Sequence, residues 1–251
     1  MSRAVVVIPC WNEARRLDAE AFLRFDARGC DVRFLFVDDG STDGTRQVLA
    51  RLALADPARF QVLALERNLG KAEAVRQGML QACASGSDHA GFWDADLATP
   101  LEEIPRFVEL LDRRPGIEMV FGSRVALLGR SIERRAIRHY AGRVFATAVS
   151  LALGLPVYDT QCGAKIFRNT PAVAALFAEP FRSRWIFDVE IVARLVRARR
   201  GTSLTAPRDA IHELPLDRWR DVRGSKIGVL DYLRAALQLV GLWWRYLRRN
   251  P

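Results

Sequence analysis

Several features that mark other protein classes are scarce in this 251-residue chain. Its four cysteines form no CxxC pair, which argues against a disulfide framework or a zinc site and favours a reducing compartment. No GxxxxGK(S/T) loop and no GxGxxG follows a strand-like run, so an ATPase and a dinucleotide dehydrogenase lose their strongest sequence argument. The longest uncharged runs, residues 144–158 and 235–244, are shorter than the roughly 20 apolar residues that a bilayer-spanning helix needs.

No cleavable apolar leader precedes the first strand-like run, so we expect the protein to remain in the cytosol. With 50% hydrophobic and 27% charged residues, the composition is that of a folded, water-facing domain. The 38 Lys and Arg against 29 Asp and Glu give a net charge of +9, which predicts an anionic partner. This excess lies in residues 124–143 and 226–251. Composition alone leaves nucleic acid, acidic lipid and phosphorylated small molecules open.

Short β-branched or aromatic runs alternate with helix-length segments in the first half of the chain. This rhythm is typical of βαβ units and predicts an α/β fold with a mostly parallel central sheet flanked by helices. The predicted strands are residues 5–8, 32–37, 60–65, 90–93, 118–121 and 165–167, with helices over 138–153 and 187–200. Thr99, Pro100 and Glu102 form a capping pattern that predicts a helix start directly after the fourth strand.

Carboxylates follow three of the predicted strands where each strand ends: Glu13, Asp38, Asp39, Asp94 and Asp96. Open α/β sheets bind ligands at this edge, and carboxylates gathered there cost energy unless a cation or hydrogen-bond donors compensate them. We therefore expect Mg²⁺ or Mn²⁺ as the cofactor, held by Asp94 and Asp96, because hard cations take oxygen ligands and accept substrate phosphates at other positions. For an isolated D-x-D pair, helix capping or solvent exposure is the simpler interpretation, and the acidic cluster is what favours a metal.

A short polar segment, Asn68 to Lys71, follows the third predicted strand and precedes a helix. Its glycine permits a tight turn, and Lys71 can reach a nucleotide phosphate or base from there. Taken alone, Lys71 is more simply interpreted as a surface residue at a helix start.

In their order along the chain, these motifs resemble the inverting GT-A glycosyltransferases of family 2. A closer resemblance, to the dolichyl-phosphate β-glucosyltransferase branch and its sister branch of dolichyl-phosphate mannose synthases, covers about residues 4–230. The motifs that carry it lie at 5–13, 37–45, 68–71, 92–100, 122–124, 159–163, 165–167, 184–185, 187–190 and 224–226. The resemblance implies a GT-A fold and a metal-dependent hexosyltransferase that moves glucose from UDP-glucose to a polyprenyl phosphate with inversion. GDP-mannose is the alternative donor, since no residue here separates uracil from guanine on physical grounds.

The resemblance also assigns roles to individual residues. Donor binding falls to Pro9, Asn12, Glu13, Asp38, Asp39, Lys71 and Asp94. Asp94 and Asp96 are expected to position the donor diphosphate through the metal and are counted as catalytic together with Arg124. Binding of the acceptor phosphate falls to Arg124, Arg138, Ser225 and Lys226. Because a lipid phosphate is already ionised near neutral pH, no strong general base is required, and Asp188 and Glu190 are interpreted as structural or site-ordering residues.

We expect one GT-A domain over residues 1–225 and an amphipathic helix over 226–251. The helix carries an apolar stripe of Leu230, Leu233, Leu237, Val240, Trp244 and Leu247, with neighbouring tryptophan and arginine residues. That composition is typical of an interfacial helix, so a membrane surface is the expected partner and the protein is placed peripherally at the cytosolic face of a membrane. Packing on the protein itself or on a dimer partner is the alternative, and the oligomeric state stays open.

Two functions from other classes compete with transfer. A basic nucleic-acid-binding protein explains the net charge, and a catalytically silent membrane-surface protein explains the C-terminal helix. Neither explains acidic residues at three strand ends, so we expect nucleotide-sugar, polyprenyl phosphate and membrane as partners and no nucleic acid.

Overall fold

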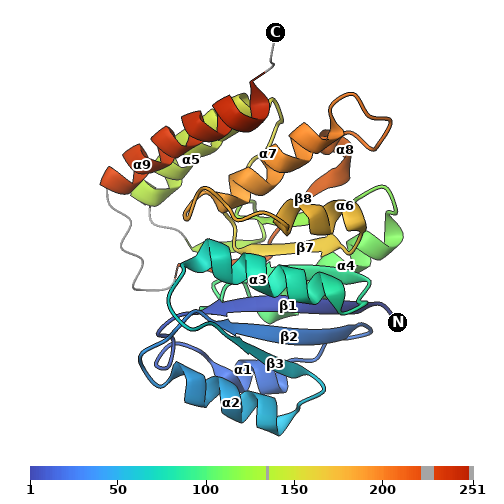
Figure 1. The fold of residues 1–251 in the computed structure, drawn as a ribbon, viewed down its shortest axis with the longest axis vertical. Helices are drawn as coiled ribbons and strands as arrows, with labels where there is room; N and C mark the ends of the chain where they lie inside the picture. Colours follow the sequence, from blue (N-terminus) through green and yellow to red (C-terminus); the bar gives the residue numbers. More distant parts are fainter. Residues whose placement is uncertain (134–135, 222–228, 249–251) are drawn as a thin grey trace.

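The computed structural model describes residues 1–133, 136–221 and 229–248, so Ser225 and Lys226 lie outside the described residues (Figure 1). Its centre is a seven-stranded sheet of order β3-β2-β1-β4-β7-β5-β8. The strands are β1 (Arg3–Cys10), β2 (Asp31–Asp38), β3 (Phe60–Ala64), β4 (His89–Trp93), β5 (Met119–Ser123), β7 (Ala164–Arg168) and β8 (Ile211–Pro215). Outside this sheet, β6 (Ser131–Glu133) pairs in parallel with β9 (Arg218–Arg220).

The sheet is mostly parallel, as the sequence predicts. Strands β3, β2, β1 and β4 run in one direction, and β5 and β8 are parallel to each other. Between them, β7 is antiparallel to both β4 and β5. The six predicted strands are confirmed, whereas the antiparallel insertion of β7 and the pairing of β6 with β9 were not predicted.

Helices cover both faces of the sheet (Figure 1). They are α1 (Ala19–Arg24), α2 (Thr45–Ala55), α3 (Lys71–Ala84), α4 (Ile104–Arg113), α5 (Ala136–Leu153), α6 (Pro171–Ala174), α7 (Phe187–Arg199), α8 (Pro207–Ala210) and α9 (Val229–Leu242), with shorter turns η1 (Leu101–Glu103), η2 (Ala175–Phe177) and η3 (Trp243–Leu247). The helices predicted over residues 138–153 and 187–200 are confirmed as α5 and α7. The apolar residues of α3, α5, α7 and α9 form one core with one face of the sheet, and those of α1, α2 and α4 form a second core with the other face.

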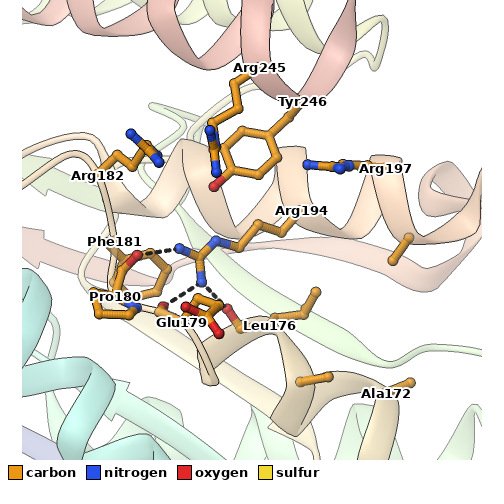
Figure 2. A pocket seen from close by; sticks show the side chains of 12 residues that line it. Ala172, Leu176, Glu179, Pro180, Phe181, Arg182, Arg194, Arg197, Arg245 and Tyr246 are labelled. Atoms are coloured by element: carbon orange, nitrogen blue, oxygen red, sulfur yellow. Dashed lines mark hydrogen bonds between the residues drawn. The ribbon is translucent and has the colours of Figure 1, made fainter.

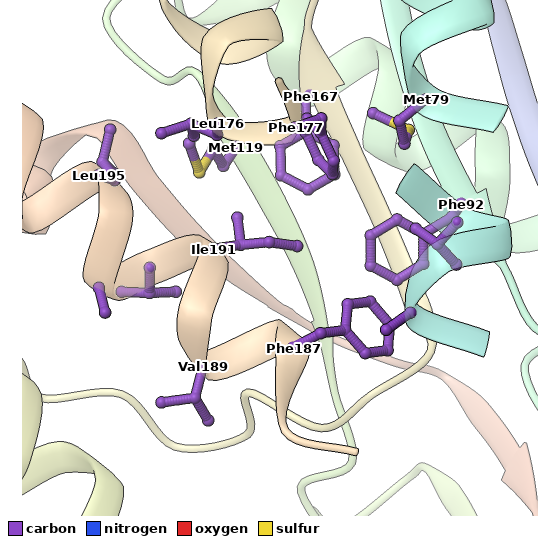
Figure 3. Close-up of a cluster of buried hydrophobic side chains, with 14 of the residues drawn as sticks. Met79, Phe92, Met119, Phe167, Leu176, Phe177, Phe187, Val189, Ile191 and Leu195 are labelled. Atoms are coloured by element: carbon purple, nitrogen blue, oxygen red, sulfur yellow. The ribbon is translucent and has the colours of Figure 1, made fainter. Parts of the chain in front are cut away.

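Helix α7 shows how the first core is built. Its residues Phe187, Ile191 and Leu195 recur at i, i+4 and i+8, so they lie on one face of the helix and are fully buried against the sheet. Figure 3 shows this face directed at Phe92 of β4 and Phe167 of β7. Removing such a side chain costs about 2–5 kcal/mol of stability through lost burial and the cavity left behind. This packing fixes the N-terminal end of α7 beside the end of β4.

Helices α5 and α9 lie side by side above α7 (Figure 1). Ala235, Leu239 and Leu242 of α9 are buried in the same core as α7. Leu247, which the predicted stripe includes, is also buried, whereas Leu237, Val240 and Trp244 are exposed. Within the described ranges, no helix combines the length and the apolarity that crossing a bilayer requires.

A helical turn does follow β4, but the prediction that Thr99 caps it is wrong. Thr99 is buried, its carbonyl accepts from Trp93 Nε1 at 2.8 Å, and its hydroxyl caps no helix. The chain instead turns through η1 before α4 begins at Ile104. A residue in the capping position therefore anchors the segment after β4 to the second core.

Candidate active site

The D-x-D pair lies directly after β4, where Asp94 and Asp96 are both half-buried. Lys71, the first residue of α3, pairs through its Nζ with Asp94 Oδ1. Asp96 Oδ1 accepts from the backbone nitrogen of Ala98 at 3.1 Å. Burial and the neighbouring Asp94 raise the pKa of Asp96, which means that its negative charge is under-compensated. Lys71 is thus an exposed residue at the start of α3, as its simpler interpretation predicts, and it also pairs with the D-x-D region.

The carboxylate of Asp94 packs against Gly163, which immediately precedes β7. A Cβ atom at this position would collide with the carboxyl carbon and both carboxyl oxygens of Asp94. Because β4 and β7 are antiparallel neighbours with Trp93 opposite Ala164, the end of β4 meets the start of β7. A glycine at position 163 is therefore what leaves room for Asp94 in this conformation.

Asp39 organises the turn before Lys71. Its two carboxyl oxygens each accept a backbone hydrogen bond of 2.8 Å, one from Leu69 and one from Gly70. Gly70 has a φ of +95°, a conformation that favours glycine, and it is the residue directly before α3. Arg184 donates from its guanidinium to the Leu69 carbonyl at 3.1 Å and closes the other side of the turn. Asp39 therefore positions Lys71, although its own burial raises its pKa.

Several of the carboxylates that follow the strands have hydrogen-bond donors of their own. Asp38 is fully buried and accepts from Ser41 N and Arg46 Nε, each at 3.0 Å. Glu13 accepts from Arg16 Nε at 2.9 Å. Within the part of the chain that the structure describes, no group of three or more His, Cys, Asp or Glu residues is arranged to hold a metal ion. The charges of Asp94 and Glu13 both raise the pKa of Asp96, so Glu13 remains a neighbour of the D-x-D pair.

The segment after β1 is tied to the loop after β2. Asn12, at a φ of 54°, donates its backbone N–H to Ser41 Oγ at 3.0 Å, and its side-chain oxygen accepts from Thr42 N at 2.9 Å. Glu13 N donates to Thr45 Oγ1 at 2.8 Å. Pro9 is half-buried within β1, opposite Val37 of β2. These contacts make Asn12 and Glu13 the link between two loops at one edge of the sheet.

A buried ion pair lies next to Lys71 and the D-x-D pair. Lys165 is fully buried, and its Nζ donates to Asp188 Oδ1 at 2.6 Å. Burial raises the pKa of Asp188, while the charges of Lys165 and Lys71 act in the opposite direction. The side chains of Lys165, Asp188, Lys71 and Asp94 thus form a row of alternating charge that ends at the D-x-D pair.

Arg124 follows β5 and is held in one orientation. Its Nε and a terminal nitrogen bind the two oxygens of Asp159 at 2.6 and 2.7 Å, a bidentate pair in which both side chains are largely buried. Asp159 raises the pKa of Arg124 against the effect of burial. The backbone nitrogens of Tyr158 and Asp159 in turn donate to Glu213 of β8, each at 2.7 Å. Asp159 belongs to one of the sequence motifs, which predicts no role for it, and no sequence pattern points to Glu213.

A cavity of about 260 Å³ is lined by Lys71, Arg124 and Asp188, whereas Asp94 and Asp96 are not among its described lining residues. Lys71, Arg124, Arg143 and Arg184 give it a cationic wall, and Phe145, Ala146, Trp185, Phe187 and Ala235 give it an apolar one. Asp159 and Asp188 line it as well, paired with Arg124 and Lys165. Gln161 also lines it, and its Nε2 is buried without a hydrogen-bond partner. An unpaired buried donor and several cations suit an anionic ligand that also has an apolar part. The side chain of Arg138, expected to bind an acceptor, lies outside the described residues.

Asp94 and Asp96 fit a divalent cation by their chemistry. They supply carboxylate oxygens, and their mutual repulsion is what a dication would relieve. Two protein carboxylates suffice for Mg²⁺ or Mn²⁺ when substrate phosphates and water complete the coordination.

Comparison with known proteins yields one matching family model, Glycosyl transferase family 2, over residues 5–173. The dolichyl-phosphate beta-glucosyltransferase of Saccharomyces cerevisiae is 30% identical over 96% of this chain and 74% of its own length. The mouse protein of the same name is also 30% identical, over 96% of this chain and 75% of its own length.

An undecaprenyl-phosphate 4-deoxy-4-formamido-L-arabinose transferase of Pseudomonas fluorescens is 31% identical over 72% of this chain and 51% of its own length. Among solved structures, glucosyl-3-phosphoglycerate synthase of Mycobacterium tuberculosis in complex with UDP superposes with a TM-score of 0.65 at 23% identity, over 97% of this chain and 80% of that one. The same enzyme with Mn²⁺, UDP-glucose and phosphoglyceric acid gives a TM-score of 0.63 at 22% identity, with the same coverage of both chains. These structural matches establish the shared fold.

Proposed function

This chain belongs to glycosyltransferase family 2, and from that premise we propose that it transfers glucose from UDP-glucose to a polyprenyl phosphate with inversion at the anomeric carbon. The observation that carries the proposal is the cavity between Lys71, which pairs with Asp94, and helices α5 and α9. It offers cations for a phosphate and an apolar wall for a lipid chain. The names of the yeast and mouse relatives favour glucose as the sugar and dolichyl-type phosphate as the acceptor.

The donor lies in this proposal at the ends of β1, β2 and β4. Pro9, Asn12 and Glu13 flank the nucleoside, and Lys71 with the D-x-D pair faces the diphosphate. The carboxylates of Asp38 and Asp39 act indirectly, because both are engaged within their own loops. Asp38 keeps the loop after β2 in shape, and Asp39 keeps the turn that presents Lys71.

The cofactor in this proposal is Mg²⁺ or Mn²⁺, held by Asp94 and Asp96. When bound, such an ion neutralises the negative charge that develops on the departing nucleoside diphosphate. Lys71 is the protein's own positive charge at this place, since its Nζ already contacts Asp94.

The acceptor phosphate is bound at the cationic wall of the cavity. Arg124 donates to Asp159 with Nε and one terminal nitrogen, which leaves its second terminal nitrogen for a phosphate oxygen. Arg143 is held by a 3.0 Å hydrogen bond to the Tyr158 carbonyl and stacks on the Tyr158 ring at 3.6 Å. Both guanidinium groups are therefore fixed before the ligand arrives, which lowers the entropic cost of binding.

The reaction then needs no proton transfer. A phosphate oxygen of the lipid forms a bond to the anomeric carbon while the bond from that carbon to the donor diphosphate breaks. Asp188 is paired with Lys165, and both oxygens of the fully buried Glu190 accept hydrogen bonds. Neither is poised as a free base, which agrees with an acceptor that is already ionised.

The paired helices α5 and α9 are proposed to meet the membrane that holds the acceptor. Val144 and Leu151 of α5 and Leu237 and Val240 of α9 are 64–79% exposed. Trp244 continues this exposed apolar face, and Arg248 stacks on it at 3.8 Å. Exposed apolar and aromatic groups next to arginine are the composition of surfaces that lie in a lipid headgroup region.

The decisive assay incubates the protein with Mg²⁺ or Mn²⁺, a short polyprenyl phosphate and a panel of nucleotide-sugars, and identifies products by mass spectrometry. We expect transfer from UDP-glucose, and preferential use of GDP-mannose would replace the donor assignment. Asp96→Asn keeps the size of the side chain and should lower turnover by about a hundredfold or more without loss of fold. Asp209→Asn, an exposed change on α8, is the matched control. Absence of transfer from every donor, while a control enzyme works, would refute the proposal.

A further inference from the structure

A second and larger cavity, of about 740 Å³, lies between η3 at the C-terminal end of α9, helix α7 and the segment after η2. It shares no lining residue with the cavity of the proposed transfer site. Its wall is rich in arginine: Arg182, Arg194, Arg197 and Arg245 all line it, and Glu179 is the acidic residue among its described lining. The proposed transfer reaction gives this cavity no role.

The guanidinium group of Arg194 is occupied by hydrogen bonds within the protein. It donates to Glu190 at 2.8 Å and to the carbonyls of Leu176 and Pro180 at 2.7 Å each, as Figure 2 shows for the carbonyl contacts. Glu190 is likewise fully used, since it also accepts from Tyr246 Oη at 2.9 Å and from the backbone nitrogen of Arg182 at 2.9 Å. The charge of Glu190 is therefore balanced by Arg194 and is not available to the other arginines of the cavity.

The remaining guanidinium groups face the cavity without such compensation. The guanidinium carbons of Arg197 and Arg245 each lie 5.8 Å from the ring centre of Tyr246. Figure 2 shows Arg182 and Arg197 on opposite sides of this ring, with Arg245 descending from the helix above. Among the described residues, no carboxylate forms an ion pair with any of these three side chains. Like charges gathered around a hollow repel one another, and a bound anion relieves that repulsion.

We propose that this cavity binds a phosphate-bearing anion at a site separate from sugar transfer. Guanidinium groups bind phosphate oxygens through paired, charge-assisted hydrogen bonds, and their fixed planar form suits phosphate better than a point charge would. The volume lies in the range of small-molecule sites, so a phosphate with an attached organic group fits. Trp243 and Trp244, which are 41% and 61% exposed, belong to the same five-residue turn as Arg245. Such a ligand reaches the cavity either as the headgroup of an anionic lipid or as a soluble phosphate compound.

The test uses the full chain and two probes. Inorganic phosphate is titrated while the Nε–H resonances of the arginines are followed by NMR, and sedimentation measures binding to vesicles of phosphatidylglycerol and phosphatidylcholine. The pocket variant is Arg182→Gln/Arg197→Gln. The matched control, Arg51→Gln/Arg208→Gln, removes the same charge from exposed positions on α2 and α8. Equal thermal melting of the two variants verifies that both are folded.

The proposal predicts that phosphate shifts the resonances of Arg182, Arg197 and Arg245 and that the pocket variant loses the response of Arg245. For a lipid headgroup, the pocket variant should also bind anionic vesicles at least about tenfold more weakly than the control variant. Loss of the phosphate response with vesicle binding equal to that of the control assigns the site to a soluble phosphate compound. Unchanged arginine resonances in the native protein, together with equal vesicle binding by both variants, would overturn the proposal.

Discussion

Lys165 and Asp188 form a 2.6 Å ion pair inside the protein, with side-chain exposures of 0% and 8%. The Lys165 ammonium lies between the rings of Phe92 and Phe121, about 5 Å from each centre, and also donates to the Cys162 carbonyl. The charge of Lys71 also acts on Asp188 and favours its ionised form. The buried ion pair therefore interacts with a residue of the proposed site. The buried charges of Lys165 and Asp188 therefore influence the position of Lys71 at the proposed site.

Replacing Lys165 by methionine should destabilise the protein by about 3–5 kcal/mol, because Asp188 would keep a buried charge without its partner. The double variant Lys165→Met/Asp188→Leu removes both charges and should recover part of that loss. Urea denaturation of the three proteins measures the difference. A loss below about 1 kcal/mol in the single variant would mean that water or another cation already compensates Asp188.

Gly163→Ala should lower turnover by about tenfold or more, because the new methyl group would occupy the place of the Asp94 carboxylate. Its backbone does not need a positive φ, so the effect should arise at the side chain of Asp94. Gly116→Ala is the matched control, since nothing lies within 4 Å of a Cβ atom built there. Steady-state rates of sugar transfer and thermal melting of both variants test this. Full activity in Gly163→Ala would show that Asp94 can move without cost.

Arg124→Lys keeps the charge but gives up the bidentate bond to Asp159. We expect KM for the polyprenyl phosphate to rise by about tenfold, with KM for the nucleotide-sugar within about twofold of the native value. Arg113→Lys, at an exposed ion pair on α4, should change neither constant. A rise in KM for the nucleotide-sugar alone would indicate that Arg124 contacts the donor and not the acceptor.

Acid should weaken the fold partly through Glu73. Hydrogen bonds from Arg76 lower the pKa of Glu73, and Arg76 also donates to the carbonyl of Ala178. The unfolded chain therefore binds a proton first as the pH falls, and the contribution of Glu73 is present above about pH 4.3 and lost below it. The free energy of unfolding, measured between about pH 6 and pH 3, should fall less steeply in Glu73→Gln than in the native protein. Identical slopes would contradict this role.

The exposed apolar face of α5 and α9 predicts binding to vesicles. Leu151→Asp/Leu237→Asp places charge on both helices and should weaken vesicle binding by about tenfold or more. Leu54→Asp, at an 80% exposed position on α2, is the control and should bind as the native protein does. Equal binding by all three proteins would indicate that this face meets something other than a lipid surface.

Local sequence was sufficient for the elements and for part of the proposed site. Strands with β-branched and aromatic runs were found where they occur, because alternating helix and strand periods are properties of short segments. The pair of Asp94 with Asp96 and the turn before Lys71 were recognised for the same reason. The partner of Arg124 was not, since Asp159 lies 35 positions away and Glu213 reaches it from β8. Such pairings depend on strand order, which no local pattern encodes.

The sequence leaves open whether a cation or hydrogen-bond donors compensate the carboxylates after β1 and β2. In the structure, Arg16 binds Glu13, and Ser41 and Arg46 bind Asp38, all within eight positions of the chain. Near neighbours in sequence can satisfy a carboxylate as well as a metal does, and composition at a strand end does not distinguish the two.

The antiparallel insertion of β7 also bears on how the protein acquires its activity. Residues 1–123 contain every donor motif up to Arg124 but lack the strand that carries Gly163 and Lys165 to the end of β4. During synthesis, Asp94 can pair with Lys71 but cannot pack against Gly163 until β7 (Ala164–Arg168) has been made and has inserted between β4 and β5. The nascent protein therefore contains the loops proposed to bind the donor well before the proposed centre is complete.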